Sequence, residues 1–187
     1  MTRDEKGSAA RHLRPESGEK TKRPEDGLPM LLRFVLKLVI IGLIVWLLLT
    51  FVLVVSVCHT NDMFPAVRDG DLVITLRLQQ PEKGGIVAYR HDGRRAYGRV
   101  VATAGDVVDI GEEGGYTVNG AVPYETVFYE TYRAEGGAVE YPYTVGEGEV
   151  FVLCDLRENL RDSRTFGAVS LKDTEGSLVL LLRRRGW

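Results

Sequence analysis

The chain has 187 residues, of which 24 are Lys or Arg and 26 are Asp or Glu, so its formal net charge is -2. This length suits one domain of ordinary size with extensions and excludes a multidomain machine. Only 2 Cys and 3 His are present, too few for a thiolate zinc site or a His-rich metal centre, so we expect no metal and no other cofactor. The near balance of charge argues against nucleic-acid binding.

Residues 1–30 are predicted to be a disordered cytoplasmic tail. They are rich in Lys, Arg, Glu, Gly and Pro and contain few apolar residues. Such a segment buries too little apolar surface to offset the entropy lost on folding.

Residues 31–57 are predicted to be a transmembrane anchor. Their apolar run, residues 38–57, contains no charged residue. As a helix with a rise of ~1.5 Å per residue it would cover roughly 30 Å, the thickness of the hydrocarbon core of a bilayer. A cleavable signal peptide would have a shorter apolar stretch and a small-residue cleavage site, so we expect an uncleaved, single span.

Charge around this span predicts its orientation. The basic residues that closely precede it are Lys20, Lys22, Arg23, Arg33 and Lys37, whereas only Arg68 and Arg77 follow closely. The excess of positive charge marks the cytoplasmic side. We therefore expect a single-pass protein of the cell membrane, with a cytoplasmic N-terminus and an extracellular domain over residues 58–187.

The residues after the span show short apolar runs separated by Gly, Asp, Asn and Pro, with no sustained helical period. This pattern predicts a mainly β domain. The expected strands are 72–76, 86–90, 97–101, 107–110, 116–118, 127–132, 139–145, 150–153 and 178–182. Turn signals between them are Asp69-Gly70, Asp92-Gly93, Asn119-Gly120 and Gly136-Gly137.

Just past the apolar run, the segment Thr60-Asn61-Asp62-Met63-Phe64-Pro65 resembles the type I signal peptidases, the S26 family, which have Ser-Met-x-Pro there. Further matching boxes follow in the family's order, at 70–73, 84–89, 98–101, 104–108, 118–120, 151–164 and 166–169. Each box is weak alone, but together they cover nearly the whole outer region. The resemblance implies a signal-peptidase-I-like β domain behind one transmembrane helix.

The resemblance also implies that the family's catalytic residues are missing. Those enzymes use a serine nucleophile and a lysine base, because a hydroxyl is a poor nucleophile until a base removes its proton. The matching boxes place Asp62 at the serine position and Gly98 at the lysine position. A third family residue, a serine that supports the lysine, is replaced by Leu160. We therefore expect a pseudoenzyme with no catalytic residue of the family's kind.

Other residues of the boxes are retained, and we expect them to form a binding cleft. Thr60 keeps a hydroxyl at the position expected for an oxyanion-hole donor, and Asp155 matches the family's buried charged framework. The expected binding residues are Thr60, Asp62, Met63, Pro65, Arg99, Asp155, Asp162 and Arg164.

The alternative to a pseudoenzyme is catalysis by residues other than the family's serine and lysine. The serines and lysines after residue 58 do not pair at a recognisable spacing. An aspartic mechanism would need Asp62 beside Asp155 or Asp162, and no aspartic-protease motif supports it. Water activation by Asp62, or help from the neighbouring His59, stays open.

The loss of the Ser-Lys pair within an intact fold resembles the noncatalytic family members that assemble sortase-built pili in Gram-positive bacteria. That resemblance implies a chaperone-like pilin assembly factor. Its partners would be a pilin or another secreted protein, with a sortase as a further candidate, and the cleft would hold an extended segment by strand addition. Two alternatives remain: an active peptidase of exported precursors, and a regulatory partner of an active signal peptidase.

Two smaller features have two interpretations each. Cys58 and Cys154 serve as small apolar residues or form a disulfide. The aromatic residues are expected to pack in the core and hairpins, with part of the set available to a partner; they are Tyr124, Phe128, Tyr129, Tyr132, Tyr141 and Tyr143.

Overall fold

The computed structural model describes residues 29–125, 127 and 129–183. The predicted cytoplasmic tail, residues 1–30, therefore lies almost wholly outside the described residues. Contacts divide the chain into one compact unit up to Ile40 and a second from Ile41. The second unit contains every strand described below.

One apolar helix opens the described chain. Helix α1 spans Met30–Leu47 and continues as a π-helical turn over Leu48–Val52. The whole helix has 23 residues and contains an 18-residue window with a mean hydropathy of 2.8, so it is long and apolar enough to cross a membrane.

The end of this helix corrects the predicted anchor boundary. We expected the anchor to run to residue 57, but Leu53–Val57 forms strand β1 and pairs along its length with β2, Leu72–Leu76. The β-branched valines of this segment suit a strand as well as a lipid-facing helix. The backbone pairing with β2, which the sequence pattern does not reveal, decides between the two.

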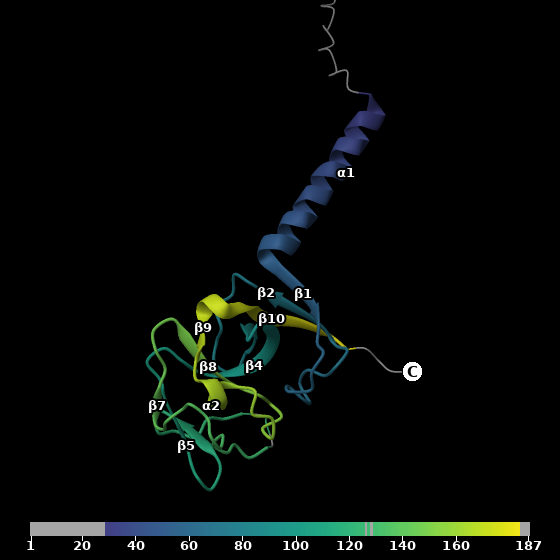
Figure 1. Ribbon diagram of the computed structural model, residues 1–187. Coiled ribbons are helices and arrows are strands. Elements are labelled where there is room, and N and C mark those ends of the chain that lie inside the picture. The colour runs from purple at the N-terminus through teal and green to yellow at the C-terminus, as the bar shows by residue number, and fades with distance from the viewer. Residues whose placement is uncertain (1–28, 126, 128, 184–187) are drawn as a thin grey trace, which may run out of the picture. The chain divides into compact units, whose positions relative to one another are not determined.

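The fold after the helix is mainly β, as predicted (Figure 1). A seven-stranded sheet has the order β1-β2-β10-β3-β4-β8-β9, and a three-stranded sheet has the order β6-β5-β7. All pairings are antiparallel. The remaining strands are β3 Ile86–His91, β4 Arg94–Thr103, β5 Val107–Ile110, β6 Tyr116–Val118, β7 Tyr143–Thr144, β8 Glu149–Leu153, β9 Val169–Ser170 and β10 Thr174–Leu182.

Most predicted strands lie where the sequence placed them. The bounds of β2, β5 and β6 match, and β3, β4, β8 and β10 include the predicted ranges and extend beyond them. Only Tyr143–Thr144 of the expected strand 139–145 is a strand, and none is described within 127–132. Two short helices were not expected, α2 over Ser163–Phe166 and a 3-10 turn over Leu171–Asp173.

Two of the predicted turns, Asp92-Gly93 and Asn119-Gly120, have the backbone conformation expected of hairpin turns. Asp92 and Asn119 have positive φ values of 49° and 55°, and the glycines that follow them have φ values of 72° and 78°. Two consecutive residues in this region make the turn type that suits the twist of a hairpin. The first of these turns joins β3 to β4 and so places Arg94 at the start of β4.

The large sheet is strongly curved, so that side chains of β1 and β4 are in contact although the two strands are not neighbours in the sheet. Ser56 on β1 and Tyr97 on β4 form a buried hydrogen bond of 2.8 Å between their hydroxyl oxygens. In the sheet order, β2, β10 and β3 separate these two strands. The curl therefore brings the outer edge of β1 close to the first half of β4.

The core between the sheets is apolar and closely packed. Phe151 and Leu153 on β8 are fully buried and pack with Val108 and Ile110 on β5. Tyr143 packs against the same cluster, as expected of the aromatic set.

Core packing holds for only part of the aromatic set. Tyr124 is 97% exposed and Tyr132 is 51% exposed, so these two rings do not pack in the core. Phe128 lies outside the described residues, whereas Tyr141 packs with the core cluster. Tyr124 and Tyr132 lie on the connection between β6 and β7, in which no strand is described.

Candidate functional site

Two of the predicted site residues, Thr60 and Asp62, lie on the segment that follows β1. Asp62 is only 7% exposed. Its Oδ1 accepts a hydrogen bond of 2.7 Å from Asn159 Nδ2, and its backbone oxygen accepts one of 2.9 Å from Leu156 N. Asp62, which the resemblance aligns with the family's nucleophile, therefore ties the segment after β1 to the segment after β8.

Gly98, to which the resemblance assigns the family's lysine, has no free space for a Cβ atom. A Cβ atom added to Gly98 would lie 2.9 Å from Val152 Cβ and 3.3 Å from Tyr89 Cε1. Tyr89 is fully buried, and its hydroxyl donates to Arg161 O at 3.3 Å. Burial raises the pKa of Tyr89, so the phenol stays protonated and cannot replace the lysine as a base.

A cavity of about 630 Å³ lies where the resemblance places the active site. It brings together Thr60, Asp62 and Leu160. Its other lining residues are Tyr89, His91, Asp92, Arg94, Arg95, Ala96, Arg161, Thr165 and Phe166. A smaller cavity of about 350 Å³ shares Thr60, Arg94 and Arg95 with it and adds Ser56, Val57, His59 and Tyr97. We call these two adjoining cavities the groove.

Two strand edges border the groove. Within the described strands, β1 has a partner on one side only. The first half of β4, Arg94 to Gly98, pairs with β3, whereas its pairing with β8 begins at Arg99. Unpaired backbone groups of this kind can accept an added strand.

The retained charged residues lie outside the groove and build the framework around it. Arg99 donates to both oxygens of Asp155, at 2.7 and 2.6 Å, and to Gly84 O at 2.6 Å. Asp162 and Arg164 form an ion pair of 2.8 Å with both side chains fully buried. Neither pair lines the groove.

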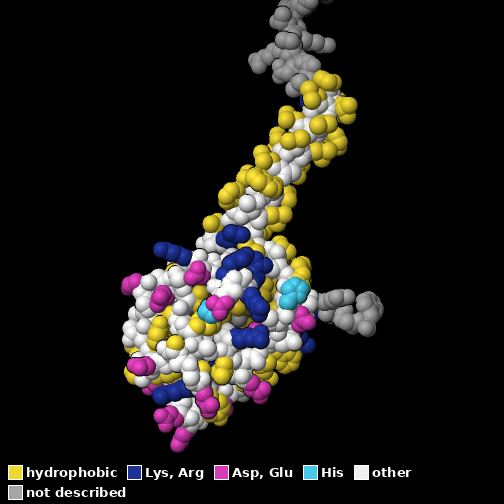
Figure 2. Space-filling model, viewed as in Figure 1, with side chains coloured by type: hydrophobic (Ala, Val, Ile, Leu, Met, Phe, Trp, Pro, Cys, Tyr) yellow, Lys and Arg dark blue, Asp and Glu magenta, His cyan; other side chains and the backbone are white. Residues whose placement is uncertain are grey.

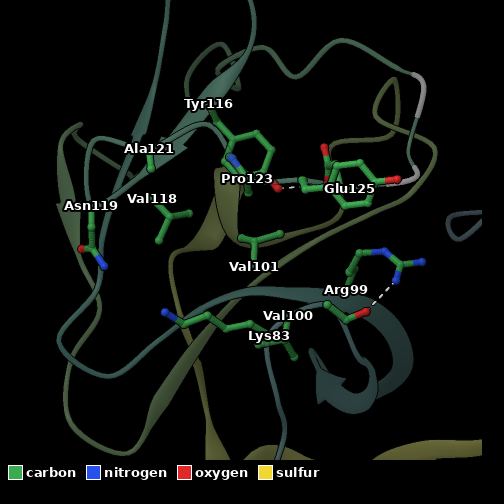
Figure 3. Close-up of a pocket in the computed structure, with 12 residues that line it drawn as sticks. Lys83, Arg99, Val100, Val101, Tyr116, Val118, Asn119, Ala121, Pro123 and Glu125 are labelled. Atoms are coloured by element: carbon green, nitrogen blue, oxygen red, sulfur yellow. Dashed lines mark hydrogen bonds between the residues drawn. The ribbon is translucent and has the colours of Figure 1, made fainter.

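A separate cavity of about 320 Å³ lies beside Arg99, and Figure 3 shows the residues that line it. Tyr116 and Glu125 lie on one side of it and Lys83 and Arg99 on the other. Both cations are already paired, because Lys83 forms an ion pair with Asp106 at 2.7 Å and Arg99 binds Asp155. This cavity therefore offers a ligand no free charge.

The remaining predicted site residues do not join the groove. Met63 is 1% exposed and belongs to the core cluster that also contains Val67 and Val73. Pro65 is exposed and does not line the groove. The structure thus gathers Thr60, Asp62 and the Leu160 position from the predicted set.

Neither cysteine of the domain is an activated nucleophile. Cys58 and Cys154 are buried free thiols, and burial raises the pKa of both. A thiol is reactive only as the thiolate, so both are poor nucleophiles, and the disulfide interpretation is wrong for this structure.

The carboxylates do not form an aspartic dyad either. Asp155 is bound by Arg99 and Asp162 by Arg164, and no hydrogen bond joins either of them to Asp62 in the described part of the chain. A dyad needs two carboxyl groups that share one proton. His59 is exposed and lines only the smaller cavity.

Sequence reasoning missed Asn159, which holds Asp62, and Arg94 and Arg161, which line the groove. Asn159 and Arg161 lie inside the matching box 151–164, but the resemblance assigned neither of them a role. Arg94 follows the Asp92-Gly93 turn, so a basic strand start could have been noted from the sequence.

Comparison with known proteins identifies the family. Residues 31–182 match the sequence model described as signal peptidase, peptidase S26. The chain belongs to the signal peptidase S26 family. Two curated relatives, both named Inactive signal peptidase IA and from Staphylococcus aureus strains COL and MW2, are each 25% identical over 158 residues. Each alignment covers 79% of this chain and 89% of the relative.

A solved signal peptidase I from Enterococcus faecalis is 28% identical to this signal peptidase family member, with a TM-score of 0.46. The match covers 54% of this chain and 98% of that structure. The fold class and the family assignment made from the sequence are thus confirmed by the strand arrangement and the family match.

Proposed function

We propose that this protein is a noncatalytic member of the signal peptidase family whose groove holds an extended segment of a secreted partner, a pilin during pilus assembly, without cutting it. Two observations together carry the proposal. A cavity of about 630 Å³ lies beside Asp62, and the neighbours of Gly98 leave no free space for a Cβ atom there.

The noncatalytic part follows from the chemistry of peptide cleavage. Hydrolysis by this family's route needs an activated hydroxyl and a base with a lowered pKa. Asp62 has no alcohol hydroxyl, and Val152 and Tyr89 crowd the position that the Cβ atom of a lysine at residue 98 would take. The curated relatives from S. aureus are themselves named inactive, which supports the same view.

The binding part follows from the strand edges. A segment laid between β1 and the first half of β4 would find unpaired backbone donors and acceptors on two sides. Main-chain hydrogen bonds supply affinity in this mode, and side-chain pockets supply selectivity. Thr60 and Leu160 would contact the segment's side chains at the centre of the groove.

The proposed place of action is the outer face of the cell membrane. The helix over Met30–Val52 would anchor the chain, and the basic residues that precede it, including Lys37, favour a cytoplasmic N-terminus. The groove would then be accessible to exported proteins before they are assembled.

Site-specific crosslinking tests this function. The full chain, with a photoreactive residue in place of Leu160, would be expressed in its own host and irradiated in intact cells. Leu160 is 39% exposed and lines the groove. We expect a covalent adduct with a pilin subunit, because the segment would pass directly over this side chain.

The matched control carries the same photoreactive residue at Leu78, which is 73% exposed and outside the groove. The control should give no pilin adduct. An adduct between the Leu160 position and an active signal peptidase would overturn the pilin proposal in favour of a regulatory role. Equal adducts at both positions would show that the groove is not the binding site.

A further inference from the structure

Two arginines in the groove have no partner of their own. Arg94 and Arg161 are exposed, and neither side chain forms a hydrogen bond or ion pair with any residue in the described part of the chain. Arg95, in contrast, is bound by Glu175. Figure 2 shows Lys and Arg side chains gathered on one face between two histidines.

This lack of partners distinguishes them from the other arginines near the former active site. Arg99, Arg157 and Arg164 each donate to a carboxylate, at 2.6, 2.7 and 2.8 Å. Where this domain buries a guanidinium, it therefore supplies an acidic counter-charge. The groove arginines are solvated while the groove is empty, and they would lose water when a segment covers them.

Loss of water has an energetic consequence. A guanidinium that is covered without a partner is destabilised, because its charge loses hydration and gains nothing in return. An acidic side chain on the incoming segment would restore the balance with charge-assisted hydrogen bonds. A neutral segment would leave the cost uncompensated, and a basic segment would add repulsion.

The carboxylates of the groove do not fill this role. Asp62 is buried and accepts its hydrogen bond from Asn159. The Asp92 side chain is 89% exposed and lies 3.5 Å from His91, its neighbour in the chain. Neither pairs with Arg94 or Arg161.

Apolar surface lies beside the two arginines. Leu160 immediately precedes Arg161 and is 39% exposed in the groove. Phe166 stacks on His91 with ring centroids 3.8 Å apart, and Ala96 lies two residues beyond Arg94. A segment that matches this lining would combine an acidic side chain with apolar neighbours.

We propose that the groove selects an extended protein segment that carries Asp or Glu beside apolar residues, with Arg94 and Arg161 as the counter-charges. This inference rests on the proposed function, since it names the chemistry of the segment that the groove holds. It assigns to these arginines a specificity role that the degenerate Ser-Lys positions do not require.

Three matched peptides test the inference. They would be capped decapeptides of one apolar sequence with two central positions occupied by Glu, Gln or Lys, each linked to an uncharged dye. Binding to the full-length protein in neutral detergent micelles would be followed by fluorescence anisotropy. We expect the Glu peptide to bind roughly tenfold more tightly than the Gln peptide, and the Lys peptide most weakly. Added salt should reduce the difference.

Two matched variants each remove two positive charges. R94Q/R161Q removes them from the groove, and R77Q/K172Q removes them from the exposed surface outside it. The first should abolish the preference for Glu and bind the Gln peptide more tightly than the unaltered protein does, because no unpaired guanidinium is then covered, whereas the second should preserve the preference. Equal binding of the Glu and Gln peptides to the unaltered protein would overturn the selectivity and leave the proposed function standing. If no peptide binds, strand addition in the groove fails, and both proposals are contradicted.

Discussion

Replacement of Arg164 by Met is expected to lower the free energy of unfolding by about 3–5 kcal/mol, because it leaves the buried Asp162 carboxylate without its counter-charge. The guanidinium also donates to Asn159 O at 2.6 Å and to Arg157 O at 2.9 Å. Those carbonyl groups would lose their donors as well. Thermal and chemical unfolding of the full-length protein in detergent would measure the loss.

The control is Arg77→Met, which replaces an exposed arginine that takes no part in this ion pair. We expect it to change stability by less than about 0.5 kcal/mol. A loss of under about 1 kcal/mol for Arg164→Met would contradict the structural role assigned to the pair. The double variant Asp162→Ala with Arg164→Met should be less unstable than the sum of the single variants, because it leaves no unpaired charge.

Restoring the family's dyad is expected to give an unstable protein and no peptidase. In the variant Asp62→Ser with Gly98→Lys, the new Cβ at position 98 would approach Val152 Cβ at 2.9 Å. Overpacking of this kind costs about 1–3 kcal/mol and displaces the lysine from the geometry that a general base needs. Unfolding and cleavage of an exported precursor would be measured on the same preparation.

Asp62→Ser alone is the control, since it changes the nucleophile position without crowding β4. It should be more stable than the double variant and equally inactive. Adding Leu160→Ser would supply the family's supporting hydroxyl but no space, so the triple variant should remain inactive too. Robust cleavage by the double variant would refute the steric argument that position 98 cannot hold a working lysine.

The sequence predicted the β architecture because its signals are local. Alternating apolar runs and turn dipeptides determine where a strand begins and ends, and Asp92-Gly93 and Asn119-Gly120 occupy the backbone region that such hairpin turns require. The end of the apolar helix could not be predicted in this way. Leu53–Val57 is as apolar as the helix before it, and only its pairing with β2 makes it a strand.

The composition of the groove was predicted only in part for the same reason. The matching boxes located Thr60, Asp62 and Leu160, which do meet in one cavity. They could not show that Arg99 pairs with Asp155 outside the groove, because strand pleat and tertiary pairing determine which face a side chain occupies. Arg94 and Arg161 are remote in sequence and come together only in the folded domain.

A cleavage assay on the full-length protein tests the central claim most directly. The detergent-solubilised protein and an active signal peptidase would each be incubated with the same exported precursor, and products would be identified by mass spectrometry. We expect no product from this protein under conditions in which the active enzyme completes cleavage. A specific product that persists through purification and is lost in Asp62→Asn would contradict the claim and would identify Asp62 as a participant in catalysis.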